Sequence, residues 1–330
     1  MSENKPSVLI TGANGFVGAR LCRTFLGEGF DVIAGVRRTS NLSQIEGLEI
    51  SYRYGDVNEP ESLATMVSGV DYIVHNAGVT KAKEPETFFE VNERGTQLLF
   101  EAIAKYNPDV KKVVMVSSLA AAGPSTGREP LTEDVAPKPI SIYGQSKLAG
   151  EKVALSFADK FSVTAVRPPG VYGPGDREIL SFFQTVNGRI KPYIGNTGRR
   201  LQLVHVDDLC RGIYGALTGD TKTCSVYYIA EDRSYSMREL ISLLETACGK
   251  RAFPVFIPGS IFKLIAAGSK ALFKLFGATP MLTPEKAREL LASWEVSTAK
   301  AREDFGYKSQ ISFEEGARQT YQWYKKEGWL

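Results

Sequence analysis

The sequence predicts an α/β protein built on a doubly wound parallel sheet, with a smaller C-terminal α/β region. Two observations carry this prediction. Short β-branched runs alternate with helical patterns over the first half of the chain, and a glycine-spaced turn separates the first strand from the first helix. Strands that alternate with helices form parallel sheets that helices cover on both faces.

The strands are expected where short apolar runs end at glycine or polar residues. They are the segments 8–10, 31–36, 52–55, 72–74, 113–116 and 163–166. Apolar residues at helical spacing follow Phe16 until Gly27 and Gly29, and longer helices are expected over about 86–106 and over 141–158.

The turn after the first strand has glycines at 12, 15 and 18. Gly12 permits the tight turn, Gly15 lets a pyrophosphate approach the backbone, and Gly18 lets the helix pack close to the strand. Amide N–H groups at the start of the helix then face the phosphates. The spacing is GxxGxxG rather than GxGxxG, but the strand–turn–helix context predicts a dinucleotide-binding Rossmann fold.

Beyond the Gly/Pro-rich loop over 170–175 the alternation weakens. The elements still recognisable there are a strand near 227–229 and helix starts at Ser236-x-x-Glu239, Thr283-Pro284 and Ser312-x-x-Glu315. We therefore expect an NAD(P)-binding Rossmann domain over 1–170, with later strands returning to it near 200–230. The region 171–330 is expected to be mainly substrate-binding.

Composition limits the class of protein. Of 330 residues, 43% are hydrophobic and 23% charged, so a large core can form and disorder is excluded as the main state. Lys and Arg total 40 against 37 Asp and Glu, and this net charge of +3 excludes nucleic acid as the main partner. Four scattered cysteines and two histidines support neither a disulfide framework nor a metal site.

The N-terminal residues show no basic region followed by an apolar stretch, so no secretory signal is expected. No run of about 18 apolar residues occurs that would span a bilayer. A cytoplasmic setting is the expectation that follows.

The end of the second strand distinguishes the two nicotinamide dinucleotides. An acidic residue there would bind the ribose 2′-hydroxyl of NAD, but this chain has Arg37 and Arg38. Guanidinium groups bind phosphate oxygens through paired hydrogen bonds, so NADP(H) is favoured and NAD(H) is the alternative. Asp56, after the third strand, is placed to reach the adenine amino group or to lie exposed in a turn.

Tyr143 and Lys147 are four residues apart on an expected helix, so their side chains share one face. A nearby ammonium lowers the pKa of a phenol from about 10, which suits acid–base chemistry near neutral pH. Ser117 and Ser118 end the strand over 113–116, at the edge where parallel sheets bind ligands. The glycine turn, serine, tyrosine and lysine in this order predict a catalytic site.

Together these motifs resemble those of the extended short-chain dehydrogenases/reductases, the NAD(P)-dependent epimerase/dehydratase superfamily. The resemblance is carried by the three glycines, Gly55-Asp56-Val57, Asn92 in Val-Asn-Glu-Arg-Gly, Ser117-Ser118, Tyr143-x-x-x-Lys147, Arg167-Pro-Pro-Gly-Val-Tyr-Gly-Pro174 and His205-Val-Asp-Asp208. It covers nearly the whole chain. The segments 37–42 and 294–324 look more like 3β-hydroxysteroid dehydrogenase-like and dihydroflavonol reductase-like members.

The resemblance implies roles for single residues. Tyr143 exchanges a proton with the substrate oxygen, which Ser118 binds, with Ser117 as the fallback. Lys147 lowers the pKa of Tyr143 and binds the nicotinamide ribose. The implied cofactor-binding set is Gly12, Asn14, Gly15, Phe16, Val17, Gly18, Arg37, Arg38, Asp56, Val57, Ala77, Lys147, Pro168 and Val171. The implied substrate contacts are Thr80, Lys81, Ser118 and Tyr172, whereas His75, His205 and Asn92 are expected to be structural.

We therefore expect an NADP-dependent oxidoreductase that interconverts a carbonyl and a secondary alcohol on a small, largely apolar molecule by hydride transfer. Leu201-Gln202-Leu203 stands where nucleotide-sugar members often carry Arg-Asp-Phe, which disfavours that branch. Two alternatives stay open: a nucleotide-sugar epimerase or dehydratase with tightly bound NAD, and a non-catalytic dinucleotide sensor. The resemblance also implies a homodimer through the helices near 86–106 and 141–158.

The stretch 261–276 is rich in Ile, Leu and Phe, with Lys263, Lys270 and Lys274 on one helical face. It is expected to be a core-facing helix with snorkelling lysines, a lid over an apolar or anionic substrate, or a peripheral membrane contact.

Overall fold

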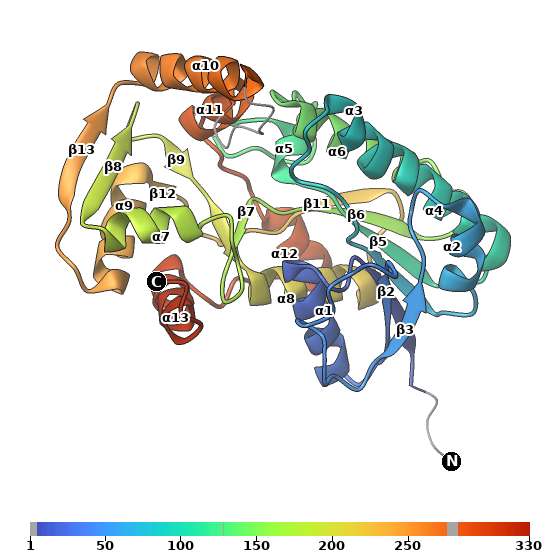
Figure 1. Cartoon of the computed structure of the whole chain (residues 1–330). Helices are drawn as coiled ribbons and strands as arrows, with labels where there is room; N and C mark the ends of the chain where they lie inside the picture. Colours follow the sequence, from blue (N-terminus) through green and yellow to red (C-terminus); the bar gives the residue numbers. More distant parts are fainter. Residues whose placement is uncertain (1–4, 128, 276–282) are drawn as a thin grey trace.

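A parallel sheet forms the centre of the protein (Figure 1), whose computed structural model describes residues 5–127, 129–275 and 283–330. The strand order is β3-β2-β1-β4-β5-β6-β11. The strands are β1 (Ser7–Thr11), β2 (Asp31–Val36), β3 (Ser51–Tyr54), β4 (Tyr72–His75), β5 (Lys112–Val116), β6 (Val163–Arg167) and β11 (Ser225–Tyr228). The predicted Rossmann-like α/β fold is confirmed, and the strand order reverses between β1 and β4.

Helices cover both faces of this sheet, as the alternation predicts. On one face lie α1 (Phe16–Gly27), α8 (Val206–Thr218) and α12 (Ala299–Phe305); on the other lie α2 (Pro60–Val67), α4 (Gly95–Tyr106) and α6 (Ile142–Leu155). Val8 and Ile10 of β1 join the first core, while Leu9 between them joins the second. Successive side chains of a strand point to opposite faces, so one short apolar strand supplies both cores.

The helix expected over about 86–106 is continuous but contains a π-helical turn. It consists of α3 (Pro85–Phe89), η1 (Glu90–Arg94) and α4. The buried Asn92 side chain donates to the Val79 carbonyl and to Ser146 Oγ, both at 3.0 Å, and accepts from the Val79 N–H at 2.9 Å. These bonds tie η1 to α6 and to the loop after β4, which is a structural role. Hydrophobic periodicity alone does not reveal such a turn.

Smaller sheets build the C-terminal region. They pair β7 (Gly170–Tyr172) with β10 (Leu203–His205), β8 (Ile190–Ile194) with β13 (Phe253–Ile257), and β9 (Arg200–Leu201) with β12 (Tyr235–Ser236). Their helices are α7 (Leu180–Asn187), α9 (Met237–Cys248), α10 (Gly259–Leu275), α11 (Pro284–Leu291) and α13 (Phe313–Lys326). The three predicted helix starts are confirmed, because Ser236, Thr283 and Ser312 cap α9, α11 and α13.

Among the described residues, no helix is both long enough and apolar enough to cross a bilayer. Helix α10 covers most of the stretch 261–276. The side chains of Lys270 and Lys274, and the whole of Phe276, lie outside the described residues.

Candidate functional site

The turn between β1 and α1 is shaped by its glycines. Gly12 has φ +66°, a conformation that side chains rarely adopt, and a Cβ on Gly18 would lie 2.1 Å from the Gly12 carbonyl oxygen. Gly15 is exposed and precedes α1, and no side chain caps the N–H groups there. Bare N–H groups at a helix start form an anion-binding site, so the turn fits a pyrophosphate.

Thr11 joins the loops that follow β1 and β4. Its Oγ1 accepts the N–H of Asn76 at 3.1 Å and that of Ala77 at 3.0 Å. A Cβ on Gly12 would lie 3.0 Å from the Ala77 Cα, so the two loops are in direct contact. Because the strand order reverses between β1 and β4, these loops form the crevice in which doubly wound sheets bind nucleotides.

His75 ends β4 under this crevice and is structural, as expected. Its Nδ1 contacts Thr11 Oγ1 at 2.9 Å, and its Nε2 contacts Thr96 Oγ1 at 3.0 Å. Burial lowers the pKa of His75 to about 3, and the charge of Lys147 adds to the effect. The imidazole therefore stays neutral in the folded protein at neutral pH.

We expect this histidine to make the protein acid-sensitive. Since the pKa of His75 is lower in the folded than in the unfolded chain, the unfolded chain takes up the proton first. The free energy of unfolding therefore decreases as pH falls from about 6.5 towards 3. Urea unfolding at pH 7 and pH 4.5 should show a loss larger in the wild type than in His75→Gln by roughly 2–3 kcal/mol. Equal losses would contradict the assignment.

Arg37 and Arg38 are exposed just after β2. The Arg37 guanidinium lies 3.9 Å from the Asp56 carboxylate, and that of Arg38 lies 5.5 Å from the centroid of the Tyr54 ring. Asn14 in the glycine turn donates to the Asn41 carbonyl at 3.3 Å, so the loop that follows β2 adjoins the turn. The loop that follows the two arginines thus adjoins the glycine turn.

The other predicted cofactor residues border the same region or support it. Phe16 and Val17 begin α1 and are partly buried against the first core. Val57 is buried, and a Cβ on Gly95 would lie 2.8 Å from it. The Pro168 carbonyl accepts the N–H of Leu119 at 2.7 Å, which joins the loop after β6 to that after β5. Their contacts with a cofactor stay predictions.

The structure brings Ser118, Tyr143 and Lys147 together. Ser118 caps the short helix α5 (Leu119–Ala122), and its hydroxyl lies near enough to that of Tyr143 to lower the pKa of the phenol. The buried Lys147 ammonium donates to the Val116 carbonyl at 2.7 Å, at the end of β5. The fallback, Ser117, is buried, and its Oγ has no hydrogen-bond partner among the described residues. The geometry thus favours Ser118.

The charge environment of Tyr143 differs from the expected one. Burial raises the pKa of the phenol, the nearby Ser118 hydroxyl opposes this rise, and Glu289 and Glu178 add to it. Lys147 is not among these causes, and its ammonium is bonded to the β5 backbone, so its expected effect on the pKa of Tyr143 stays a prediction. Burial also lowers the pKa of Lys147 to about 8. Tyr143 is thus a protonated phenol at neutral pH, ready to donate.

Sequence reasoning missed a buried ion pair beneath Lys147. Arg167 Nε donates to Glu151 Oε2 at 2.9 Å and Nη2 to Oε1 at 2.5 Å, and Arg167 Nη1 lies 3.3 Å from the Tyr228 hydroxyl. The Glu151 charge opposes the lowering of the Lys147 pKa. The signal was present, because Glu151 follows Lys147 at the same four-residue spacing that links Lys147 to Tyr143.

One predicted substrate contact is wrong. The Tyr172 side chain is fully buried, with its ring 5.0 Å from that of Phe313 and 5.3 Å from that of His205. It belongs to the core of the C-terminal region, because side chains alternate along β7 and this one points inward. Thr80 is exposed in the loop after β4, and Lys81 pairs with Glu178 at 2.6 Å.

The aspartates after His205 lie in the first turn of α8. His205 caps α8, and its Nδ1 accepts the N–H of Asp207 at 3.3 Å. Asp207 pairs with Arg20, and Asp208 accepts the N–H groups of Gln310 and Ile311, both at 2.9 Å. These carboxylates join α8 to α1 and to the chain that leads into α13.

Comparison with known proteins agrees with this geometry. Residues 8–230 match the NAD dependent epimerase/dehydratase family. A ceramide reductase of Caulobacter vibrioides is 30% identical over 327 residues, covering 98% of this chain and 96% of the relative. A 3 beta-hydroxysteroid dehydrogenase/Delta 5-->4-isomerase of Mycobacterium tuberculosis is 27% identical, covering 96% and 90%.

Among solved structures, the crystal structure of gox2253 is similar, with a TM-score of 0.83 and 26% identity, covering 98% of this chain and 99% of that one. These similarities agree with the fold, with the crevice at the glycine turn, and with the cluster of Ser118, Tyr143 and Lys147. The chain belongs to the NAD dependent epimerase/dehydratase family and is an NAD(P)-dependent oxidoreductase of the extended short-chain dehydrogenase/reductase type.

Proposed function

We propose that the protein is an NADP-dependent oxidoreductase that interconverts a ketone and a secondary alcohol on a largely apolar molecule. The observation that carries this proposal is the convergence of the Ser118 and Tyr143 hydroxyl groups and the buried Lys147 ammonium at the carboxyl end of β5. Two hydroxyl groups that meet at this edge can bind one substrate oxygen between them. We further assign residues 171–330 mainly to substrate binding.

In the proposed reaction Ser118 orients the substrate oxygen and Tyr143 exchanges a proton with it. A phenol whose pKa is raised holds its proton at neutral pH, so Tyr143 acts as the donor when a carbonyl is reduced. Lys147, bonded to Val116, fixes the adjoining strand end and places a positive charge beside the site. When bound along the glycine turn, the dinucleotide supplies the redox equivalent for the substrate carbon.

The segment around Leu201-Gln202-Leu203, where nucleotide-sugar members often carry Arg-Asp-Phe, favours an apolar substrate. Gln202 is buried and bonds the Glu231 carbonyl at 2.6 Å and the Val296 N–H at 2.7 Å. Arg199 is buried and donates to the carbonyls of Ile194 and Asn196, while Arg200 donates to Ser234. Part of each guanidinium group is thus bonded within the protein, which makes this segment less suited to hold a diphosphate.

Net turnover of added cofactor tests the reaction class. We expect steady loss of reduced-nicotinamide absorbance when NADPH and long-chain or steroidal ketones are supplied. Flat absorbance while a nucleotide sugar is converted would instead establish an epimerase or dehydratase that reoxidises its own NAD. Dinucleotide binding without turnover of any carbonyl would favour the sensor alternative.

Arg37 is the residue we propose to read the 2′-phosphate. Arg37→Ala should weaken NADPH binding about tenfold or more and NADH binding less than about twofold, since it removes a charge-assisted hydrogen bond to a phosphate that NADH lacks. Titration calorimetry with both cofactors measures this. Arg318→Ala, which removes an exposed guanidinium on α13, is the matched control. Equal losses for both cofactors would reject the NADP preference.

The family resemblance also implies a homodimer through α4 and α6, which contact each other in this structure. We keep this as a proposal that light scattering of the purified protein tests. The cytoplasmic setting likewise stays a prediction from the N-terminal sequence.

A further inference from the structure

Exposed apolar side chains gather on one edge of the C-terminal region. They are Ile190, Phe253, Val255, Phe256, Ile261, Leu264 and Ile265, from β8, β13 and α10. Phe253 and Leu264 are each 73% exposed, and Phe256 is 63% exposed. Single exposed hydrophobic residues are ordinary, whereas a gathered set of this kind marks a binding surface. We call these seven residues the β13–α10 patch.

The patch extends over β8, β13 and α10, which adjoin one another (Figure 1). Strand β13 pairs with β8 over its whole length and leads directly into α10. The inner face of α10 packs through Phe262 and Ala266 against α11 and Ile257. Its outer face presents Ile261, Leu264 and Ile265 at helical spacing. One face of the helix is thus buried, as a core-facing helix predicts, but a second apolar face is exposed to solvent.

The chain segment that carries most of the patch is basic. Between residues 250 and 284 the sequence has basic residues at Lys250, Arg251, Lys263, Lys270 and Lys274 and no acidic residue. Of these, Lys250, Arg251 and Lys263 have described side chains, and all three are exposed.

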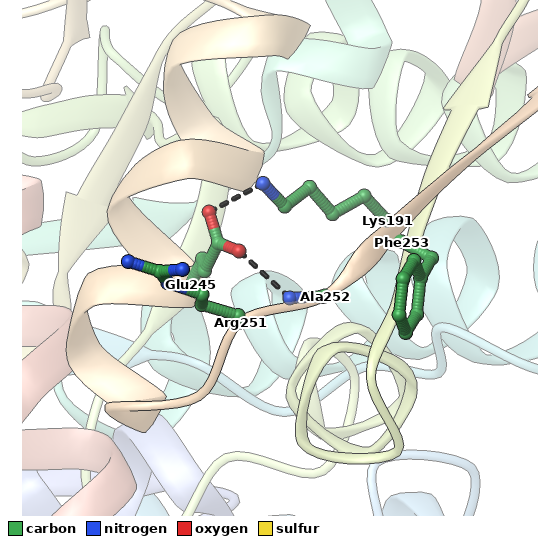
Figure 2. A pocket seen from close by; sticks show the side chains of 5 residues that line it. All are labelled: Lys191, Glu245, Arg251, Ala252 and Phe253. Carbon is green, nitrogen blue, oxygen red and sulfur yellow. Dashed lines mark hydrogen bonds and ion pairs between the residues drawn. The ribbon is translucent and has the colours of Figure 1, made fainter.

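A surface hollow beside the patch contains the carboxylate of Glu245. It is lined by Lys191, Glu245, Arg251, Ala252 and Phe253 (Figure 2). Glu245 pairs with the Lys191 ammonium at 2.5 Å and accepts the Ala252 N–H at 2.8 Å. That carboxylate is therefore neutralised within the protein, and Arg251 adds its charge to the basic border of the patch.

We propose that the β13–α10 patch docks on an anionic lipid bilayer. Apolar side chains on a strand and a helix would enter the acyl boundary while the basic residues meet the headgroups, as in peripheral amphipathic segments. Docking would also cover β13, an edge strand whose apolar residues are otherwise open to solvent. A second copy of the chain fits less well, because a symmetric contact would oppose the same basic residues.

Helix α11 lies between the patch and the charge environment of Tyr143. Helix α11, against which α10 packs, carries Glu289, one of the carboxylates that raise the pKa of Tyr143. A docked protein would thus hold its site close to the bilayer, where a largely apolar substrate concentrates. This consequence rests on the proposed function, whereas the docking itself does not.

Vesicle co-sedimentation tests the docking. The full chain should sediment with phosphatidylcholine vesicles that contain about 30% phosphatidylglycerol, and less with phosphatidylcholine alone or in high salt. The double variant Phe256→Ser/Leu264→Ser should lower binding about tenfold or more, since both apolar anchors are lost. Lys263→Glu should lower it several-fold. Val135→Ser, at a residue 46% exposed elsewhere on the surface, is the matched control and should bind like the wild type.

Equal sedimentation of the wild type and the double variant, or no binding to anionic vesicles, would overturn the proposal. A dimer that the double variant abolishes, without vesicle binding, would assign the patch to self-association instead. Reduction of a small water-soluble ketone should stay unchanged in the double variant, because neither residue lies at the catalytic cluster. Loss of docking is thereby distinguishable from failure of the proposed reaction.

Discussion

Replacing Tyr143 with phenylalanine should lower kcat by about 100- to 10,000-fold, because it removes the hydroxyl that exchanges a proton with the substrate oxygen. The affinity for the dinucleotide should stay nearly unchanged. The ring itself is retained, and with it the contact with Phe88, whose ring centroid lies 6.2 Å away. Steady-state kinetics together with calorimetric cofactor titration separate the two effects.

A matched control for this variant is Tyr106→Phe, which removes a phenolic hydroxyl from an exposed ring at the end of α4. It should leave both kcat and cofactor affinity at the wild-type value. Turnover by Tyr143→Phe at a rate close to that of this control would show that another group moves the proton.

Arg167→Met should lower the free energy of unfolding by about 3–5 kcal/mol, the largest stability effect that we expect. It leaves the Glu151 carboxylate buried without its partner, since the two side chains are only 4% and 3% exposed. Urea denaturation measures the loss. The double variant Glu151→Met/Arg167→Met should recover part of it, because no unpaired charge then stays buried.

The exposed pair Arg318–Glu314 on α13 is the comparison for this effect. Arg318→Met should cost no more than about 1 kcal/mol, because solvent screens an exposed ion pair. If Arg167→Met also lowered the free energy of unfolding by no more than about 1 kcal/mol, the buried pair would contribute little to stability. The variant Glu151→Gln should also lower the pKa of Lys147 further, since the Glu151 charge now opposes that lowering.

The parallel core was predictable because its signal is local. Most strands that alternate with helices in the first half coincide with a short apolar run, and the predicted strand 31–36 coincides with β2. The glycine turn and the spacing of Tyr143 and Lys147 are likewise set by neighbours in sequence. Helix α2 was not anticipated, although Pro60 at its start is a typical first helical residue.

What local patterns could not give is the environment that distant residues create. The side chain of Tyr172 looked accessible beside a Gly/Pro-rich loop, but Phe313 and His205 enclose it from far along the chain. Burial likewise raises the pKa of Tyr143, and Glu289 and Glu178, neither of which lies near it in sequence, add to the rise. The strands β8 and β13 show no alternation of apolar and polar residues in sequence, because β13 is almost wholly exposed and β8 is only partly buried.

The return of β11 to the central sheet has a consequence for biosynthesis. This strand pairs with β6 only after an intervening stretch that builds part of the other region, and Lys112 in β5 donates to the Gly219 carbonyl at 2.6 Å. While the first 170 residues emerge from a ribosome, the outer edge of β6 and the surface that α8 later covers are bare. The nucleotide-binding sheet is therefore completed late in translation. A nascent chain halted near its midpoint would expose the unpaired edge of β6, which chaperones could bind.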